Sequence, residues 1–534
     1  MKNRIMRAKT NFNTSFFNRQ ISDVNEISQQ DVEKLNPEML EERKRLKEIF
    51  DLIDTGEEKV QIIACPSISL KREDIEKIVA IDLYEMRSLW QILYAVKRNI
   101  HVLYLSSNPV ETENVKHLLS CVGLDEEIKS RISFYDLAEF GGLNLSEKII
   151  NSGPFLNTLE KQINKYPTFL MPFNYTDIER RLAGILGIPV FGCHPSLNYW
   201  QTKSGNKTIF RRADIPMPEG VENLKSKEDI IFGVMNLWRQ FPAQMKYMVK
   251  LDSGVSGEGN ALLTLDMDFS QFDRLSIKEK LDYIEARLNE MRFQQKDLDF
   301  AEFANRMEAG GIIEVFLEGD NFYSPSSQGY IHPNLKVELL ATHEQVLDKS
   351  GMKFLGCRFP APADIRDHIA EWTKEIGSEL SQIGVIGFFS VDYIVYENEK
   401  GEEEIKVIEI NIRQGGTTHP YQTAKLVTNA KFNDAKGILE SSNGNPVHYF
   451  ANDNFCLENL KHSAPKNLIG HLEKKNVLFN PRSQKGAVLH MLNSMSRFGK
   501  IGYTVIGSSK DEVDGIRLEL EKVVDEYASS LAKA

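Results

Sequence analysis

The sequence predicts an α/β protein built from several domains, and three observations support this. The chain has 534 residues, a length typical of about three to four domains. Its composition, 41% hydrophobic and 26% charged, is that of a soluble globular protein. From residue 55 to 200, short apolar runs alternate with amphipathic segments. This alternation predicts a parallel sheet with helices on its faces.

The first 200 residues divide into a helical extension, 1–54, and an αβ domain, 55–200. Residues up to about 20 look irregular, whereas 22–54 carry Leu, Ile, Glu and Lys at helical spacing behind a candidate cap, Ser22. In the αβ domain the pattern predicts strands at 61–69, 101–105, 168–172 and 189–193, and helices at 84–98, 113–122 and 177–186.

The rest of the chain divides into a unit at 201–445 and a small αβ unit at 446–534, with a linker expected at 443–446. Ser276 and Glu279 have the spacing of a capping box. The larger unit is predicted to have helices ending near Ala213 and at 276–287, 297–309 and 365–383, and strands at 245–251, 311–317, 330–340 and around Asp392 and Glu409. The last unit is predicted to have strands at 475–480, 486–492 and 503–507 and a helix at 511–531.

Charge and cysteine content exclude several classes of partner. The net charge of −11 argues against nucleic acid and against an anionic membrane surface. Five scattered cysteines without a Cys-x-x-Cys pair fit a reducing compartment and give no disulfide or zinc framework. The basic start is not followed by an apolar segment, and no run is long enough to span a bilayer. We therefore expect a cytoplasmic protein.

The run from Val407 to Arg413 alternates apolar residues with Glu409, Asn411 and Arg413. In a strand these polar side chains share one face, about 7 Å apart. Asp392 lies in another strand-like run, so two neighbouring strands would present Asp392, Glu409 and Asn411 together. Carboxylate and amide oxygens suit Mg²⁺, and a guanidinium suits phosphate oxygens. The alternative is a half-buried strand with a solvated polar face.

A second motif is an apolar strand that ends at Lys250 and enters a loop rich in glycine and serine. Glycine lets backbone N–H groups approach a phosphate closely, and lysine adds a point charge. The loop lacks the Gly-Lys-Ser/Thr of a Walker A motif, and a simple hairpin turn is the alternative. Its candidate phosphate-binding residues are Ser253, Gly254, Ser256, Gly257 and Gly259.

A third motif, Gly311 to Asn321, is an apolar strand broken at a glycine with acids on both sides. Such a segment lines an adenine pocket with backbone amides and brings polar residues to the ribose, although an edge strand with a solvated turn is the alternative. Lys207, near a predicted helix start, is by itself more typical of a surface residue.

Taken in order, these motifs resemble the ATP-grasp superfamily over about residues 195–445, in its carboxylate–amine ligase branch. Residues 55–200 look like a pre-ATP-grasp domain. The tail, with the runs beginning at Gly486 and Gly499 and an acidic helix, resembles the C-terminal domain of the pheganomycin peptide ligase family. The resemblance implies an α+β ATP-grasp fold in the central unit, with ATP and Mg²⁺ as cofactors and Mn²⁺ as a substitute ion.

The resemblance also implies roles for the motif residues. Lys207 and Lys250 would hold the α- and β-phosphates, and the loop 253–259 would fold over them. Asp392, Glu409 and Asn411 would bind Mg²⁺, with Glu409 bridging two ions, and Arg413 would stabilise the transferring phosphoryl group. The chain departs from many relatives at Ile412 and Ser390. Adenine and ribose would be contacted by Glu314, Val315, Phe316, Leu317 and either Asp320 or Asn321.

Substrate residues are less specified. Lys336 and Arg358 are candidates for pairing with a carboxylate, although each is more often a surface charge. The acceptor would meet the segment that follows the metal strand, where a lone histidine is more often structural than catalytic. The candidates in that segment are Gly415, Gly416, Thr417 and His419.

The predicted function is ATP-dependent amide formation between a small-molecule carboxylate and an amine, such as amino acids or peptides, through an acyl phosphate. Two alternatives stay open: a catalytically silent ATP-binding scaffold module, and an ATP-dependent small-molecule kinase. Relatives of this type are often homodimers, so a homodimer is an expectation.

Overall fold

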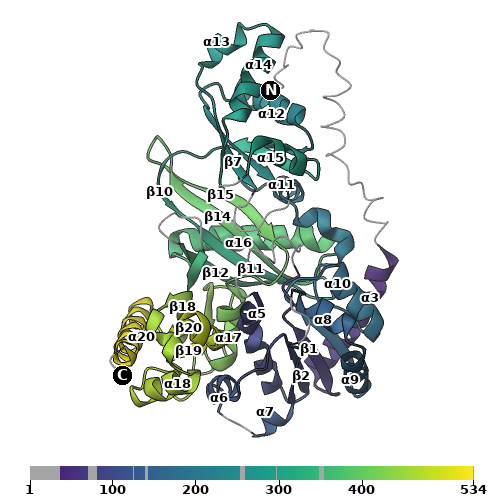
Figure 1. Cartoon of the computed structure of the whole chain (residues 1–534), viewed down its shortest axis with the longest axis vertical. Coiled ribbons are helices and arrows are strands. Elements are labelled where there is room, and N and C mark those ends of the chain that lie inside the picture. Colours follow the sequence, from purple (N-terminus) through teal and green to yellow (C-terminus); the bar gives the residue numbers. More distant parts are fainter. Residues whose placement is uncertain are drawn as a thin grey trace.

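The structure is a computed structural model that describes residues 36–69, 81–123, 126–138, 142–252, 259–295, 298–347 and 354–532. It consists of a parallel sheet, a small antiparallel sheet and a large antiparallel sheet, each covered by helices (Figure 1). The predicted α/β class is therefore confirmed, with a parallel N-terminal sheet and antiparallel ATP-grasp-like sheets. Across the described ranges, the helices are too short or too polar to traverse a bilayer.

The N-terminal sheet has the strand order β3-β2-β1-β4 and is parallel throughout. Its strands are β1 (Val60–Cys65), β2 (Ile100–Ser106), β3 (Ile132–Asp136) and β4 (Thr168–Pro172). The predicted strand at 61–69 ends early because Pro66 follows Cys65 and cannot donate a ladder hydrogen bond. Its helices are α5 (Ile81–Tyr84), the 3₁₀ helix η1 (Glu85–Val96), α6 (Thr112–Ser120), α7 (Glu126–Ser130), α8 (Leu145–Asn151), α9 (Gly153–Ile163) and α10 (Asp177–Leu186).

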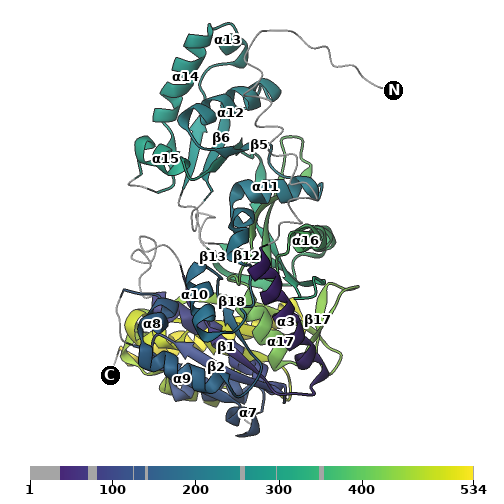
Figure 2. The same ribbon diagram turned by 90° about the vertical axis from the view of Figure 1, so that its right-hand side faces the viewer.

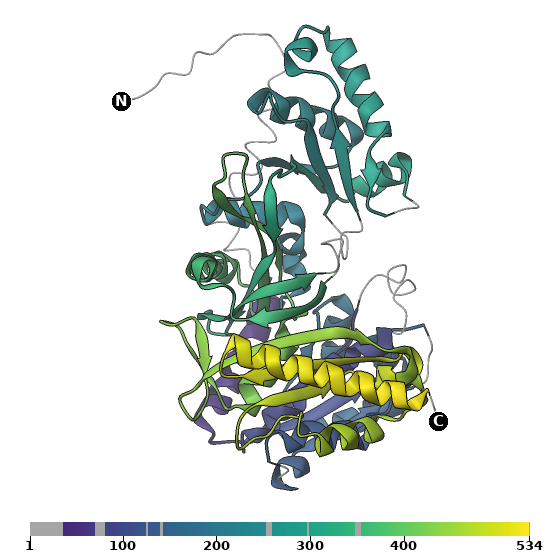
Figure 3. The ribbon, with the colours of Figure 1, turned by 90° about the vertical axis from the view of Figure 1, so that its left-hand side faces the viewer.

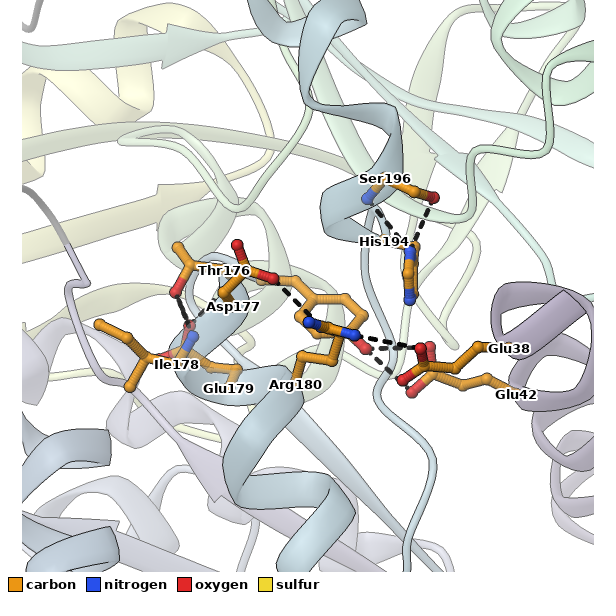
Figure 4. A network of polar contacts seen from close by, with 10 residues as sticks. Glu38, Glu42, Thr176, Asp177, Ile178, Glu179, Arg180, His194 and Ser196 are labelled. Atoms are coloured by element: carbon orange, nitrogen blue, oxygen red, sulfur yellow. Dashed lines mark hydrogen bonds and ion pairs between the residues drawn. The ribbon is translucent and has the colours of Figure 1, made fainter. Parts of the chain in front are cut away.

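The N-terminal extension enters the described part as helix α3 (Pro37–Thr55), and the start of the predicted helix at 22–54 lies outside the described residues. Figure 4 shows Glu38 of α3 facing Arg180 of α10, with Glu42 beside it. Glu38 Oε2 lies 3.1 Å from Arg180 Nη1, and Glu42 accepts a 2.8 Å hydrogen bond from Val190 N–H. Burial raises the pKa of Glu42 to about 7, although the Val190 hydrogen bond opposes the shift. These contacts fix α3 to the αβ domain.

An upper lobe contains the five-stranded antiparallel sheet β5-β9-β6-β7-β8 (teal, top of Figure 1). It has its own hydrophobic core around the fully buried Trp238. Its strands are β5 (Gly220–Leu224), β6 (Lys246–Leu251), β7 (Asn260–Thr264), β8 (Arg292–Phe293) and β9 (Gly311–Val315). Its helices are α12 (Lys227–Gln240), α13 (Phe269–Asp273), α14 (Ile277–Asn289), capped by Ser276 as predicted, and α15 (Phe300–Met307).

The large sheet joins the middle and lower parts of the molecule. The predicted single strand at 330–340 is wrong, because Leu335 adopts a positive φ in a tight turn between two antiparallel strands. Helix α16 (Ala363–Gln382) packs on the sheet (Figure 2). The strands here are β10 (Asp320–Tyr323), β11 (Pro325–Ile331), β12 (Val337–Leu347), β13 (Phe354–Phe359), β14 (Gly387–Glu397) and β15 (Glu403–Asn411).

The tail continues the same sheet, because β18 (Pro446–Cys456) pairs with β13 on one side and with β20 (Lys500–Gly507) on the other. The predicted division at 445 stays a prediction, and the sheet is continuous across it. The predicted strand at 475–480 is wrong: this segment makes only single bridges, through Leu478 and Asn480. Helix α20 (Lys510–Leu531) lies across the outer face of the tail strands (yellow, Figure 3).

The remaining elements are η2 (Pro195–Gln201), α11 (Lys203–Arg212), α17 (Thr418–Val427), β16 (Lys431–Asn433), β17 (Ile438–Glu440), η3 (Glu458–His462), α18 (Pro465–Lys474), β19 (Gly486–His490), η4 (Leu492–Ser494), α19 (Met495–Phe498) and β20 (Lys500–Gly507). One hydrophobic core connects the parallel sheet with the large sheet, where the Phe191 ring lies 5.3 Å from that of Tyr330. The parallel sheet and the large sheet therefore share one core, whereas the upper lobe and the tail have cores of their own.

Candidate active site

The predicted acidic cluster forms on two neighbouring antiparallel strands. Asp392 of β14 pairs with Glu409 of β15, and Ser390 pairs with Asn411. Asp392 Oδ1 accepts a 2.7 Å hydrogen bond from Gln345 Nε2, and its Oδ2 accepts one of 3.1 Å from Asn411 Nδ2. The structure thus brings the three predicted metal ligands together.

The electrostatics of this cluster favour a cation. Burial raises the pKa of Asp392 to about 7, and the neighbouring Glu409 carboxylate adds to the shift. One ammonium, Lys203 Nζ, lies 3.5 Å from Glu409 Oε1. Two close carboxylates and an amide oxygen are the hard donors that Mg²⁺ uses, and a bound divalent ion would allow both acids to ionise.

Arg413 extends the cluster beyond the end of β15. Its Nη2 donates a 3.0 Å hydrogen bond to Asn411 Oδ1, and its guanidinium lies 5.9 Å from the centre of the Phe173 ring. Burial lowers the pKa of Arg413, but a guanidinium stays charged at physiological pH. A fixed, half-buried positive charge beside the acids suits a phosphoryl group that develops charge during transfer.

The two predicted phosphate lysines converge on one carboxylate. Lys207 Nζ of α11 lies 2.8 Å from Glu314 Oε2, and Lys250 Nζ of β6 contacts Glu314 Oε1. Burial would raise the pKa of Glu314, but the two ammonium groups lower it to about 2. The three charged side chains are nearly inaccessible, so the pocket carries one surplus positive charge in a dry environment.

Helix α11 connects the two clusters. Its cap residue Thr202 accepts a 3.0 Å hydrogen bond from Gly205 N–H. A Cβ on Gly205 would lie 2.2 Å from Tyr199 O, so only glycine allows this tight approach. Asn206 Oδ1 accepts a 2.7 Å hydrogen bond from Ile410 N–H of β15. This anchor places Lys203 beside Glu409 and, one turn further, Lys207 beside Glu314.

The predicted nucleotide residues have mixed outcomes. The N–H groups of Val315 and Phe316 already donate to the backbone carbonyls of Glu219 and Lys246, at 2.8 and 3.1 Å. Asp320 and Asn321 are exposed on β10, where Asn321 Nδ2 donates to Glu397 Oε2 at 2.9 Å. Four loop residues lie outside the described residues, and Gly259 lies just after them, before β7. The four are Ser253, Gly254, Ser256 and Gly257.

The two predicted carboxylate-binding cations are not brought together. Lys336 is exposed in the β11–β12 turn, with Nζ 3.3 Å from Glu338 Oε1. Arg358 lies opposite Glu344, near the other end of β12, and its Nη2 donates at 2.9 Å to Asp514 Oδ1 of α20. The Arg358 guanidinium is thus held by the tail helix, which leaves its predicted substrate role without structural support.

The segment after Arg413 lines a cavity, together with Pro66, Arg87 and Phe173. Gly415 and His419 lie on its wall. Gly416 packs on the Phe354 ring, and Thr417 Oγ1 accepts a hydrogen bond from Gln328 Nε2. His419 is buried, which lowers its pKa to about 4, and its Nε2 lies 3.0 Å from Asp453 Oδ1.

Sequence reasoning missed several residues of this region. Lys203 lies in the same motif as Lys207, and its position at the start of the helix was a signal that could have found it. Gln345, Phe173 and Arg87 come from distant segments and had no such signal. The same is true of Asp453 and His490, which meet His419 only through the fold.

Comparison with known protein families agrees with this geometry. Residues 196–299 and 275–435 match the family described as "IQCH-like, ATP-grasp". The chain therefore contains an ATP-grasp domain. Residues 467–520 match the "PGM1 C-terminal domain", within the tail that the sequence likened to a peptide ligase domain. The predicted ATP-grasp resemblance is confirmed.

Over 478 residues the chain is 27% identical to L-propargylglycine–L-glutamate ligase of Streptantibioticus cattleyicolor, covering 88% of this chain and 94% of the relative. It is 22% identical over 284 residues to IQ motif-containing protein H of Danio rerio, covering 48% of this chain but 27% of that protein. A solved structure of biotin carboxylase from Campylobacter jejuni is similar with a TM-score of 0.48 and 12% identity, over 86% of this chain and 90% of that one. The likeness to a ligase over most of both chains confirms the predicted class, an ATP-dependent ligase.

Proposed function

We propose that the protein joins the carboxylate of one amino acid or short peptide to the amine of another, with conversion of ATP to ADP and phosphate. One observation carries this proposal: a cluster of acids and a cluster of lysines lie beside the same helix, α11. Acids and an amide surround Asp392, whereas two lysines surround Glu314. A metal-bound triphosphate needs both kinds of partner within its own length.

The residues present fit Mg²⁺, with Mn²⁺ as a substitute ion of the same oxygen preference. Asp392, Glu409 and Asn411 would hold it, and Glu409 would serve two ions. When bound, such ions neutralise charge between the β- and γ-phosphates. Lys207 and Lys250 would bind the α- and β-phosphates, and a polyphosphate there would replace Glu314 as their counter-charge.

The reaction follows from the weakness of a carboxylate as an electrophile. A donor carboxylate oxygen attacks the γ-phosphorus, ADP leaves, and an acyl phosphate forms. The acceptor amine then attacks the carbonyl carbon, phosphate leaves, and the amine proton passes to solvent. Arg413 is fixed beside the acids, where it would stabilise the phosphoryl oxygens during transfer.

The substrates are proposed to be two amino acids or short peptides that meet in the cavity next to Arg413. Gly415 and His419 line this cavity together with Arg87 of the N-terminal domain. The name of the relative from Streptantibioticus cattleyicolor gives L-propargylglycine and L-glutamate as its substrates, so L-glutamate is the first acceptor to try. We also propose that the protein forms a homodimer. The proposed location is the cytoplasm, which the five unpaired cysteines favour.

The test is ADP and phosphate release with Mg-ATP against a matrix of amino acids and dipeptides, with mass spectrometry of the products. Release that requires two co-substrates and yields an amide mass supports the proposal. A phosphorylated product without an amine would instead identify a kinase. Nucleotide binding without turnover in any combination would favour a silent scaffold. Glu403→Gln, an exposed change on the same strand as Glu409, is the matched control for Glu409→Gln.

A further inference from the structure

A second polar cluster lies at the joint between the N-terminal domain, helix α17 and the tail strands. His419 comes from α17, Asp453 from β18 and His490 from β19. One ligand atom from each of the three lies within 4.8 Å of the others, and the side chains are 5, 5 and 13% exposed. Segments that are far apart in the sequence thus deliver two imidazoles and a carboxylate to one buried point.

The three atoms form a nearly equilateral triangle. His419 Nε2 lies 3.0 Å from Asp453 Oδ1 and 3.2 Å from His490 Nε2, and His490 Nε2 lies 2.8 Å from the same Oδ1. Each Nε2 carries at most one proton, so two protons serve three contacts and one contact lacks a hydrogen bond. Three ligand atoms around one tetrahedral ion, each about 2.0–2.1 Å from it, lie about 3.3–3.4 Å apart. The observed triangle is close to that size.

The surroundings hold this arrangement in place. Among the described residues, His419 Nδ1 has no hydrogen-bond partner, so the polar contacts of that ring are made through Nε2. Gly502 pairs with His490 across the β19–β20 ladder, and a Cβ there would lie 2.3 Å from His490 Nε2. Arg87 Nε lies 3.3 Å from Asp453 Oδ2, so the carboxylate directs one oxygen to Arg87 and the other to the histidines. Ligating carboxylates commonly have such an outer partner.

We propose that His419, Asp453 and His490 bind a divalent transition-metal ion of the zinc class. Two imidazoles and one carboxylate are borderline donors that select Zn²⁺, Co²⁺ or Ni²⁺ over Mg²⁺. A cavity lined by both histidines adjoins the triangle and gives room for a fourth ligand, a water or a substrate group. The ion would tie α17, which follows the Arg413 segment, to the strands of the tail.

The first test uses the full-length protein, stripped with a chelator and titrated with Co²⁺. We expect one equivalent to bind with visible d–d absorption of a four- or five-coordinate site, stoichiometric displacement by Zn²⁺, and no displacement by millimolar Mg²⁺. If this absorption were absent and no zinc were retained after dialysis, the proposal would be overturned. The three side chains would then form only a hydrogen-bonded contact between their segments.

Variants locate the ion. His490→Gln should abolish Co²⁺ absorption, and Gly502→Ala, which keeps all three ligands but displaces the His490 ring, should weaken binding about tenfold. His101→Gln on β2, stacked on Tyr166 outside the cluster, is the matched control and should bind normally. Circular dichroism checks the fold of each variant, and if His490→Gln does not fold, Gly502→Ala and the wild-type titration still decide. Normal binding in folded His490→Gln or Gly502→Ala, or loss of binding in Glu409→Gln, would refute the site.

Discussion

The two halves of the candidate active site show how neighbours decide the charge of a buried acid. Glu314 lies between two lysines and has a pKa of about 2, whereas Asp392 lies beside Glu409 and has a pKa of about 7. Glu314 is buried and Asp392 is half-buried, and burial raises the pKa of each. The Glu314 half thus has surplus positive charge and suits an anion, whereas the Asp392 half has two neighbouring carboxyl groups and suits a cation. A metal nucleotide supplies both.

The first prediction removes the shared counter-charge of the lysines. Glu314→Gln leaves two ammonium groups buried without a carboxylate, so we expect the free energy of unfolding to fall by about 3–5 kcal/mol. Mg-ATP should raise the melting temperature of the variant more than that of the wild type, because triphosphate replaces the lost charge. Differential scanning calorimetry measures both effects.

The matched control for this change is Glu318→Gln, which breaks only the half-exposed pair with Lys246. This change should lower the free energy of unfolding by about 1 kcal/mol or less. If Mg-ATP raised the melting temperature of wild type and of Glu314→Gln equally, Glu314 would not be part of the phosphate-binding site.

The second prediction tests the acid-rich half. Glu409→Gln should lower kcat/KM for amide formation on the order of 10²–10³-fold, since charge at the phosphoryl groups is no longer held in place. Steady-state kinetics that follow ADP release, with Glu403→Gln as the control, measure this loss of kcat/KM. Activity within a few fold of wild type would contradict the assignment of the acids to the metal.

The third prediction concerns pH. The pKa of Glu314 is lowered in the folded state, from 4.5 to about 2. Its contribution to stability, about 3 kcal/mol, is therefore present above about pH 4.5 and is lost as the pH falls toward 2. The denaturation midpoints of wild type and Glu314→Gln should therefore become more similar as the pH falls over this range. A constant difference would show that the ion pairs do not cause the shift.

The fourth prediction addresses the link between the halves. Lys203 Nζ lies 3.5 Å from Glu409 Oε1 and competes with a cation for that carboxylate. Lys203→Met should therefore lower the Mg²⁺ concentration needed for half-maximal activity by about 2- to 5-fold. A Mg²⁺ titration of initial rates reads out the change, and a rise in the required concentration would show that Lys203 supports metal binding instead.

The smallest effect is expected at Lys336. Its ammonium is exposed and contacts only Glu338 among the described residues, so Lys336→Ala should change stability by about 0.5 kcal/mol or less. The KM of both co-substrates should stay within about twofold of wild type. A large rise in one KM would support the substrate role predicted for Lys336 from the sequence.

Sequence reasoning found the features that depend on local periodicity and motif order. Alternation of side chains placed Glu409 and Asn411 on one face, and the order of Lys207, Lys250 and Glu314 predicted the ATP-grasp domain. Strand 168–172 and helix 177–186 were predicted with the bounds that the structure has. Such features survive folding because they are set by the backbone repeat and by capping residues.

Features that depend on distant pairing were missed. The 330–340 segment is apolar enough for one strand, but whether Leu335 turns the chain depends on which strands flank it. The 475–480 segment resembles a strand, yet the neighbouring strand β19 forms its ladder of hydrogen bonds with β20 instead.

The sequence by itself predicted the ATP-grasp domain, the acids proposed to bind metal and the lysines proposed to bind phosphate, because these residues lie in short motifs whose geometry follows from a single strand or helix. Only the tertiary structure decided that Glu314 joins the two lysines, that Arg358 pairs with Asp514 of the tail helix, and that His419 meets Asp453 and His490. These contacts join segments tens to hundreds of residues apart. Their geometry arises when separate sheets and helices pack, and no local pattern encodes it.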